Sequence, residues 1–154
     1  MKCVLVVVTA AGVLAGAWVA LQERNFSGEW VLNTAKSKIA TPGIQAGTVR
    51  IEHKETAFSF QRTFTTADGP DTSRYDLVIG GSEKVERSGS ETRHSRMYWE
   101  AGQLVLDEKI EIGGRTATNV VHYSLEDGGR TLVARESFRA PKLQYDNVWV
   151  FDRR

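Results

Sequence analysis

Three polar side chains interrupt apolar strand faces and are the residues most able to do chemistry in this sequence. Arg62 shares a face with three phenylalanines in "AFSFQRTF", Glu108 interrupts a face of leucine and isoleucine, and Asn147 lies between Tyr145 and Trp149. A buried polar group without a partner is costly, so such residues indicate a cavity where a ligand supplies the partner. The predicted ligand-binding residues are Phe58, Phe60, Arg62, Phe64, Leu106, Glu108, Tyr145, Asn147 and Trp149.

Two interpretations of Arg62 and Glu108 stay open at this point. In the first, both side chains hold the polar end of a ligand whose body packs on Phe60, Leu106 and Trp149. In the second, they form an internal ion pair or lie at a barrel mouth and reach water. Substituting leucine at positions 62 and 108 separates the two interpretations, because unchanged affinity in folded variants contradicts the first.

The residues typical of catalytic or metal sites do not form a recognisable pattern. His53, His94 and His122 fall on three different predicted strands, with no H-E-x-x-H pair or other short ligand spacing. The sequence also has no G-x-S-x-G nucleophile motif. We therefore expect no metal, no cofactor and no enzymatic activity; for an enzyme, His94, His122 or Glu108 would be the candidate catalytic residues.

Short turn sequences recur about every ten residues and separate segments rich in β-branched and aromatic residues. Side chains in these segments alternate with period two, so that Leu104, Leu106, Ile110 and Ile112 share the face of Glu108. This pattern predicts nine or ten antiparallel strands, with longer loops around Pro42 and Pro141. The turns are Asp68-Gly69-Pro70, Gly80-Gly81-Ser82, Ser88-Gly89-Ser90, Ala101-Gly102, Gly113-Gly114 and Asp127-Gly128-Gly129.

Consecutive hairpins of this kind favour a closed barrel over a sandwich, because closure removes exposed strand edges. We predict an all-β fold, a single antiparallel up-and-down β-barrel of eight to ten strands over residues 26–154. Only residues 33–38, "NTAKSK", offer a single helical turn. Closure requires the first strand, "GEWVLN", to pair with the last, "YDNVWVFDRR".

The N-terminal segment is typical of an export signal. Lys2 precedes an uncharged apolar run that includes the small residues Ala15-Gly16-Ala17, which predicts a signal peptide over residues 1–17. The alternative is an uncleaved anchor extending to residue 21, since the apolar run is about long enough to span a bilayer. Both interpretations predict a secreted or periplasmic protein, and cleavage would remove the only cysteine, Cys3.

The charge balance argues against nucleic acid as a partner. The chain has 20 basic and 19 acidic residues, and removing Lys2 with the leader leaves a net charge of zero. Basic stripes or a strongly basic domain are the usual footprint of a nucleic-acid-binding protein. We expect a monomer that contacts membrane only through an uncleaved N-terminal segment.

One pattern in the sequence predicts how an end of the barrel is closed, and it consists of Gly28, Trp30 and a C-terminal arginine. If the chain enters the first strand across the bottom of the barrel, Trp30 plugs that end and Gly28 permits close backbone approach. Arg153 or Arg154 then lies over the indole. "FSGEW" with a terminal arginine resembles the G-x-W signature of the lipocalins and wider calycins. The segments "FSGEWVLNTAKSK", "YWEAGQLVL", "YSLEDGGRTL" and "VWVFDRR" resemble exported bacterial proteins with lipocalin-like domains.

The resemblance implies an eight- or ten-stranded barrel whose interior holds a small, usually apolar ligand. It does not extend to the disulfides of secreted lipocalins, nor to the Arg-x-Tyr pair that binds a carboxylate in fatty-acid-binding members, because Tyr145-Asp146-Asn147 stands there. It implies a protein that sequesters or carries a small hydrophobic or amphipathic molecule. The alternative is a plugged barrel with a structural or protein-interaction role in the cell envelope, and a pocket of about 300 Å³ or more would favour the ligand.

Overall fold

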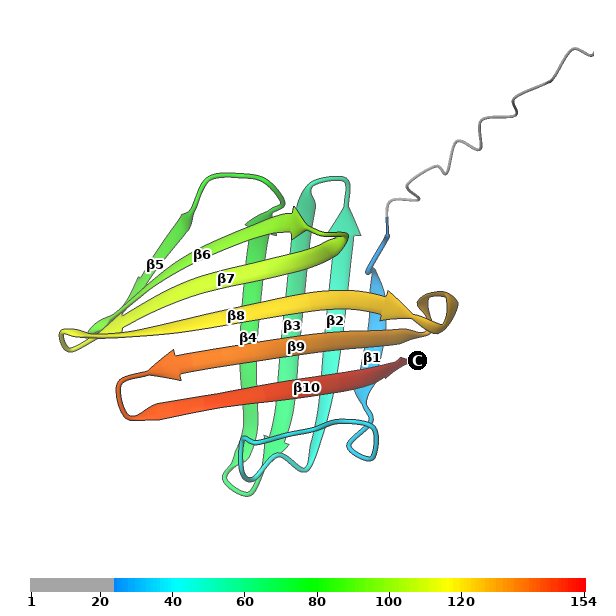
Figure 1. The fold of residues 1–154 in the computed structure, drawn as a ribbon, viewed down its shortest axis with the longest axis horizontal. Coiled ribbons are helices and arrows are strands. Elements are labelled where there is room, and N and C mark those ends of the chain that lie inside the picture. Colours follow the sequence, from blue (N-terminus) through cyan, green and yellow to red (C-terminus); the bar gives the residue numbers. More distant parts are fainter. Residues whose placement is uncertain (1–23) are drawn as a thin grey trace, which may run out of the picture.

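The computed structural model describes residues 24–154, which form one ten-stranded antiparallel sheet (Figure 1). The predicted leader, residues 1–17 or 1–21, lies outside the described residues. The strands are β1 (Gly28–Leu32), β2 (Ala46–Lys54), β3 (Ala57–Thr66), β4 (Gly69–Val78), β5 (Lys84–Ser88), β6 (Glu91–Glu100), β7 (Gln103–Ile112), β8 (Arg115–Glu126), β9 (Thr131–Ala140) and β10 (Leu143–Arg153).

The sheet curls into a nearly closed barrel because consecutive strands pair as hairpins and the first strand pairs with the last. Strand β1 lies between β2 and β10, with Trp30 opposite Arg153 in the β1–β10 ladder. Strands β1–β4 run across the direction of β6–β10 and lie behind them in Figure 1. The predicted all-β up-and-down barrel is confirmed, with ten strands, and so is the pairing of the two terminal strands.

The barrel has a seam between β4 and β5, where the described residues form no hydrogen-bonded ladder. At one end of this seam Ile79 forms a parallel bridge with Met97 of β6, and the amide of Gly80 donates to the Met97 carbonyl over 2.7 Å. Further along, the Arg93 guanidinium of β6 donates to the Tyr75 hydroxyl of β4 over 2.9 Å. Backbone and side-chain contacts from β4 and the residues after it to β6 therefore hold the barrel together at the seam.

Most connections between strands are the tight turns that glycine-rich sequences predict. The turn at Glu55-Thr56 between β2 and β3 is an exception, since it contains neither glycine nor proline and holds Glu55 at a positive φ of 55°. The expectation of a long loop around Pro141 is wrong: Pro141 and Lys142 form a two-residue turn between β9 and β10. The fixed φ of proline suits the first central position of such a turn.

The one long connection, residues 33–45, follows β1 and lies against β10. Its predicted helical turn is a single turn, in which the Asn33 carbonyl accepts from the amide of Ser37 over 3.1 Å. Lys38 then pairs with Val148 of β10 as an isolated antiparallel bridge. The helical structure of residues 24–154 is a short 3₁₀ turn at Asp127–Gly129. The described residues contain no helix that is long and apolar enough to cross a membrane.

Trp30 lies fully buried at one end of the barrel, and Gly28 and Arg153 enclose it. The indole Nε1 donates to the Phe26 carbonyl over 3.1 Å, and the Arg153 guanidinium lies 4.3 Å from the ring centroid. Arg153 also donates to the carbonyls of Ser27 and Gly129, each over 2.9 Å. A Cβ at Gly28 would approach Arg153 Nη1 to 2.7 Å, so glycine leaves room for the arginine.

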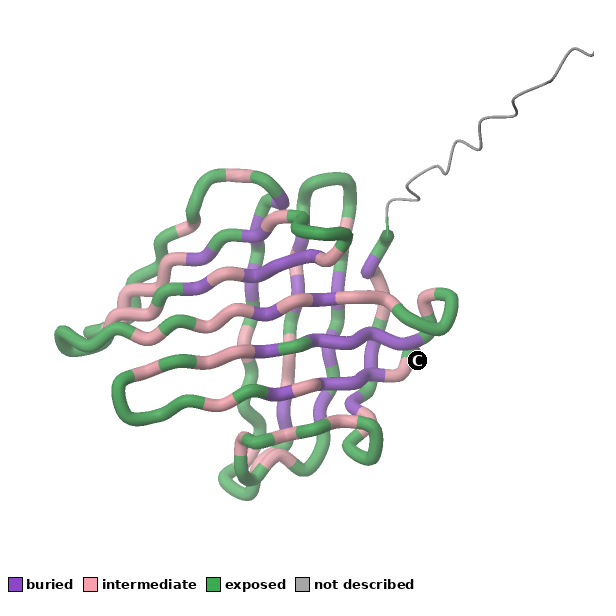
Figure 2. The backbone as a smooth tube through the Cα atoms, in the orientation of Figure 1, coloured by how far each residue is buried: buried purple, intermediate pink, exposed green. Residues whose placement is uncertain are grey.

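Burial is uneven along the barrel (Figure 2). The end that contains Phe26, Trp30 and Leu104 holds fully buried side chains, and we refer to it as the closed half. The opposite end, near the turns at residues 89–90, 113–114 and 141–142, has mostly intermediate and exposed residues, and we refer to it as the open half. The hydrophobic core therefore occupies the closed half and the barrel centre.

Candidate functional site

The predicted ligand-binding residues point into the barrel, and at its centre they pack against one another. Phe60 stacks on Tyr75 with ring centroids 4.8 Å apart, and Phe64 stacks on Trp149 with centroids 4.7 Å apart. The remaining space is about 20 Å³, room for about one water molecule. The predicted residues that are buried are Phe58, Phe60, Phe64, Leu106, Glu108, Asn147 and Trp149.

Glu108 is the centre of a buried polar cluster contributed by four strands. Its carboxylate accepts a hydrogen bond from Asn119 Nδ2 over 3.0 Å, and longer ones from the Ser95 and Tyr75 hydroxyls over 3.4 and 3.5 Å. Arg93 Nη1 lies 3.9 Å from Glu108 Oε1. Burial raises the pKa of Glu108 above the ordinary carboxyl value, although these four donors oppose the shift. Burial together with the Glu108 charge likewise raises the pKa of Tyr75 to about 12.

Arg62 also points into the barrel, but the cation nearest the Glu108 carboxylate is Arg93. The Arg62 guanidinium lies over the Phe64 ring, 4.6 Å from its centroid, and Nη2 donates to the Ser73 hydroxyl over 3.4 Å. Its Nε is buried and has no hydrogen-bond partner among the described residues. The predicted Arg62–Glu108 ion pair is therefore not formed, and a ligand-binding role for either residue stays a prediction.

Asn147 and Glu136 hold the long β1–β2 connection on β10. The Asn147 amide nitrogen donates to Glu136 Oε2 and to the Thr41 hydroxyl, over 2.8 and 2.9 Å. Its oxygen accepts from the backbone amides of Ala40 and Thr41. Glu136 Oε2 also accepts from Trp149 Nε1 over 2.9 Å. The fold itself thus uses both polar atoms of Asn147, and its predicted contact with a ligand stays a prediction.

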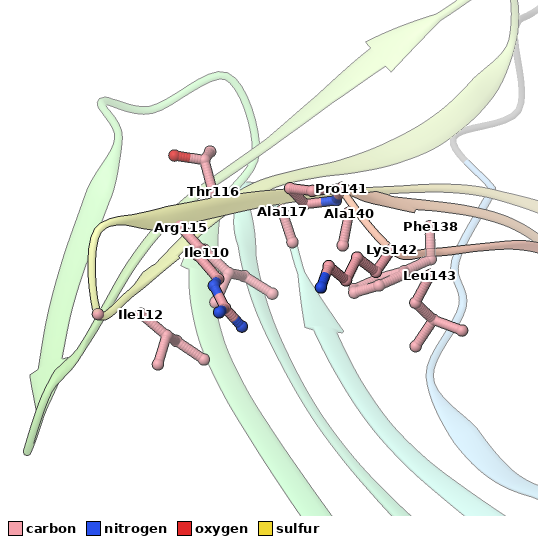
Figure 3. Close-up of a pocket in the computed structure, with 11 residues that line it drawn as sticks. Ile110, Ile112, Arg115, Thr116, Ala117, Phe138, Ala140, Pro141, Lys142 and Leu143 are labelled. Atoms are coloured by element: carbon pink, nitrogen blue, oxygen red, sulfur yellow. The ribbon is translucent and has the colours of Figure 1, made fainter.

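A pocket of about 570 Å³ lies in the open half, between the β7–β8 and β9–β10 hairpins, and we refer to it as the mouth pocket (Figure 3). Its walls are mainly the apolar side chains of β7 to β10. Tyr145 stacks on one wall residue, Phe138, with ring centroids 4.9 Å apart. The lining residues are Ile110, Ile112, Gly113, Arg115, Thr116, Ala117, Phe138, Ala140, Pro141, Lys142 and Leu143.

Arg115 and Lys142 are the charged residues among those that line this pocket. They lie at the ends of neighbouring hairpins, and Figure 3 shows both side chains reaching into the space beneath the strands, whereas Thr116 points to the other side. Ile112 and Leu143 at the rim are 47% and 58% exposed. An apolar pocket with two cations at its rim can hold an apolar body and a polar group at the same time.

Sequence reasoning missed this pocket although part of its signal was present. Ile110 and Ile112 continue the inward face of β7 beyond Glu108, and their exposure places them past the packed core. The sequence around Pro141-Lys142 predicts a long loop, whereas the two residues form a tight turn that is part of the pocket wall. Alternation shows which way a side chain points, but depth along the barrel depends on strand stagger.

None of the three histidines lines the mouth pocket. His53, near Phe26, shares a second hollow of about 420 Å³ with Trp99 in the closed half. His94 lies 2.8 Å from Glu83, and His122 lies opposite Val105 on β7. Within residues 24–154, no three histidine, cysteine or acidic residues are grouped closely enough to hold a metal ion.

Solved structures with the same strand arrangement have very different sequences. The REP1-NXSQ fatty acid transporter superposes with a TM-score of 0.57 at 12% identity, covering 84% of this chain and 96% of that chain. Secretory abundant heat soluble protein 4 from Ramazzottius varieornatus gives 0.53 at 14% identity over 85% and 96%. Zebrafish ileal bile acid-binding protein complexed with cholic acid gives 0.51 at 14% identity over 84% and 98%.

The chain has a calycin-like β-barrel fold. The resemblance first seen in the G-x-W pattern is thus shown for the fold. No protein-family model matches the chain, and no curated protein matches it in sequence. In this calycin-like barrel the centre is filled by side chains, and the pocket of about 570 Å³ lies at the mouth.

Proposed function

We propose that this protein is an extracytoplasmic binding protein that holds a small hydrophobic or amphipathic molecule in the mouth pocket of its barrel. The observation that carries the proposal is the apolar pocket of about 570 Å³ between the β7–β8 and β9–β10 hairpins. Its volume lies within the range typical of small-molecule sites, about 300 to 1,000 Å³. The centre, with about 20 Å³, has no room for such a molecule.

The structural neighbours support binding in preference to catalysis. One is named as a fatty acid transporter and another as a bile acid-binding protein complexed with cholic acid. Fold alone does not fix function, so the support for this chain comes from the pocket together with those names. The extracytoplasmic location is part of the proposal and rests on the signal-peptide pattern of residues 1–17.

A filled barrel supports a second candidate function. The packed centre and the buried Trp30 are the features expected of a barrel that needs no ligand. In that case the protein has a structural or interaction role in the cell envelope, and the mouth pocket binds no small molecule.

The proposal is tested first with protein expressed from the full chain and purified without detergent. Native mass spectrometry reports whether a small molecule of fixed stoichiometry is retained. Titration with the neutral fluorescent probe N-phenyl-1-naphthylamine then measures the affinity of the apolar pocket. We expect saturable binding with one site for each chain.

A substitution that fills the pocket identifies the site. Ala117 lines the pocket on the inward face of β8, whereas the next residue, Thr118, is exposed on the outward face. Ala117→Phe should weaken probe binding about tenfold, equivalent to about 1.4 kcal/mol, and Thr118→Phe should leave it unchanged. If the wild-type protein binds no probe, or the folded Ala117→Phe variant binds it normally, the mouth pocket is not the site and the second candidate function is favoured.

A further inference from the structure

The charges of the mouth pocket have one sign at its rim. The two charged lining residues are Arg115, which begins β8, and Lys142, in the turn before β10. Within the part of the chain that the structure describes, no acidic residue lines the pocket. A pocket with apolar walls and unbalanced positive charge attracts amphiphiles with a negative group.

The rim cations differ from two neighbouring basic residues of the open half, Lys109 and Arg139, which have acidic partners. Lys109 forms an ion pair with Glu111, and Arg139 pairs with Asp146 over 2.7 Å. Within residues 24–154, Arg115 and Lys142 form no ion pair. Their charge therefore remains available to a molecule in the pocket.

The pocket has a polarity that fixes how such a molecule lies. Arg115 is opposite Ile112 in the β7–β8 ladder, and the next inward pair is Ile110 with Ala117. Beneath this apolar layer comes the pair of Glu108 with Asn119. From the rim inward, the pocket lining therefore changes from two cations to apolar side chains, and Glu108 lies beneath this apolar layer without lining the pocket.

The alternative position for a negative group is Arg62, whose Nε has no partner. Arg62 borders the central space of about 20 Å³, which is too small for an ionic head group, and it does not line the mouth pocket. The accessible cations are those at the rim.

The geometry points to a ligand class for the proposed binding function: amphiphiles with one anionic head group, bound with the head between Arg115 and Lys142 and the tail on Ile110, Ala117 and Phe138. This inference rests on the proposed function and adds to it the charge and the orientation of the ligand. Carboxylate, sulfonate and sulfate heads share this chemistry, and guanidinium and ammonium groups bind each of them.

A matched pair of probes tests the inference separately from the proposed function. 8-Anilinonaphthalene-1-sulfonate and N-phenyl-1-naphthylamine share the same ring system and differ in the sulfonate. We expect the sulfonate to bind about tenfold more tightly than the neutral probe at low salt, because it would form two partly exposed ion pairs with the rim cations. High salt should remove this advantage because it screens exposed charges.

Rim variants assign the preference to the two cations. Arg115→Gln combined with Lys142→Gln should weaken sulfonate binding about tenfold and leave the neutral probe unchanged. The matched control combines Lys109→Gln with Arg139→Gln, which removes two nearby cations from the outer face and should change neither probe. Decanoate should displace the sulfonate from the wild-type protein more strongly than decanol does, which extends the result to a carboxylate head.

The possible failures are distinguishable. If neither probe responds to Ala117→Phe, the proposed binding function is wrong. If both probes bind in the pocket with equal affinity, or the double rim variant keeps its preference for the sulfonate, the anionic ligand class is wrong while pocket binding stands. If Arg62→Met weakens sulfonate binding and the rim variant does not, the head group lies inward and the proposed orientation is overturned.

Discussion

Strand β7 shows the contrast between the closed and open halves of the barrel on a single face. Leu104 and Leu106 are at most 2% exposed, whereas Ile112, on the same face of the strand, is 47% exposed. Between them Glu108 marks the change, because its hydrogen bonds to neighbouring strands close the packed region. The same side-chain alternation therefore produces a core at one end of a strand and a pocket wall at the other.

The comparison shows that the direction in which a side chain points does not determine how deeply it is buried along the barrel. Aromatic rings from three strands fill the barrel centre, where a space of about 20 Å³ remains, and the Trp30 indole is fully buried in the closed half. The open half has smaller residues facing inward, such as Ala117 and Ala140, and these leave room for a pocket. Stability should therefore depend on the closed half and ligand affinity on the open half.

The largest expected effect comes from shortening a side chain in each half of β7. Leu106→Ala should destabilise the protein by about 2 to 5 kcal/mol, because it removes a buried side chain and leaves a cavity. Ile112→Ala should cost less than about 1 kcal/mol, since half of its side chain is already in water. Urea unfolding measures both values.

The same two variants should show the reverse order in their loss of ligand affinity. Ile112 lines the mouth pocket, so Ile112→Ala should weaken N-phenyl-1-naphthylamine binding, and Leu106→Ala should not while the protein stays folded. Equal losses of stability, or equal losses of affinity, would show that the two halves are not independent.

A smaller effect is expected from Gly28→Ala in the closed half. Gly28 has φ of +147°, and a Cβ there would force the Arg153 guanidinium away from the Trp30 ring. We expect a loss of about 1 to 3 kcal/mol in the free energy of unfolding, with probe affinity unchanged. The control is Gly102→Ala, which has φ of +78° and no atom within 4 Å of the new Cβ. If both variants lose the same stability, the stacking over Trp30 contributes nothing beyond backbone strain.

The smallest expected effect is a change in pH dependence at the boundary between the halves. Burial raises the pKa of Glu108 in the folded protein, so its stability contribution is fully present below the ordinary carboxyl pKa and is lost as pH rises through the raised value. Glu108→Gln removes this titration, so the variant should gain stability relative to wild type as pH increases. Urea unfolding at a series of pH values measures the trend. The control is Glu100→Gln at an exposed position, whose free energy of unfolding should change with pH as it does in the wild-type protein. If the free energy of Glu108→Gln also follows the wild type at every pH, the prediction is wrong.

The fold could be predicted largely from the sequence because its signals are local. Glycine-rich turns and period-two alternation define hairpins without knowledge of distant residues. The turn at Glu55-Thr56 has no such composition, and the sequence around Pro141-Lys142 predicts a long loop where the structure has a two-residue turn. In both places the strand ladders on each side determine the turn.

The site was less predictable because its contacts join residues far apart in the sequence. The inward direction of Arg62, Glu108 and Asn147 follows from alternation, but their partners depend on strand register and stagger. Glu108 therefore contacts Arg93 and not the expected Arg62. The mouth pocket depends in the same way on how far the β7–β8 and β9–β10 hairpins extend beyond the packed core.

The pairing of the terminal strands has a consequence for how the chain folds. Of the nine strand ladders among residues 24–154, eight join consecutive strands and only β1–β10 joins distant parts of the chain. The seam divides the remaining ladders into two hairpin series, β1–β4 and β5–β10. The connections within each series are short, except for the longer one between β1 and β2. Because contacts between distant residues carry the larger loop-closure entropy, we expect each series to form first and the meeting of the two chain ends to limit the folding rate.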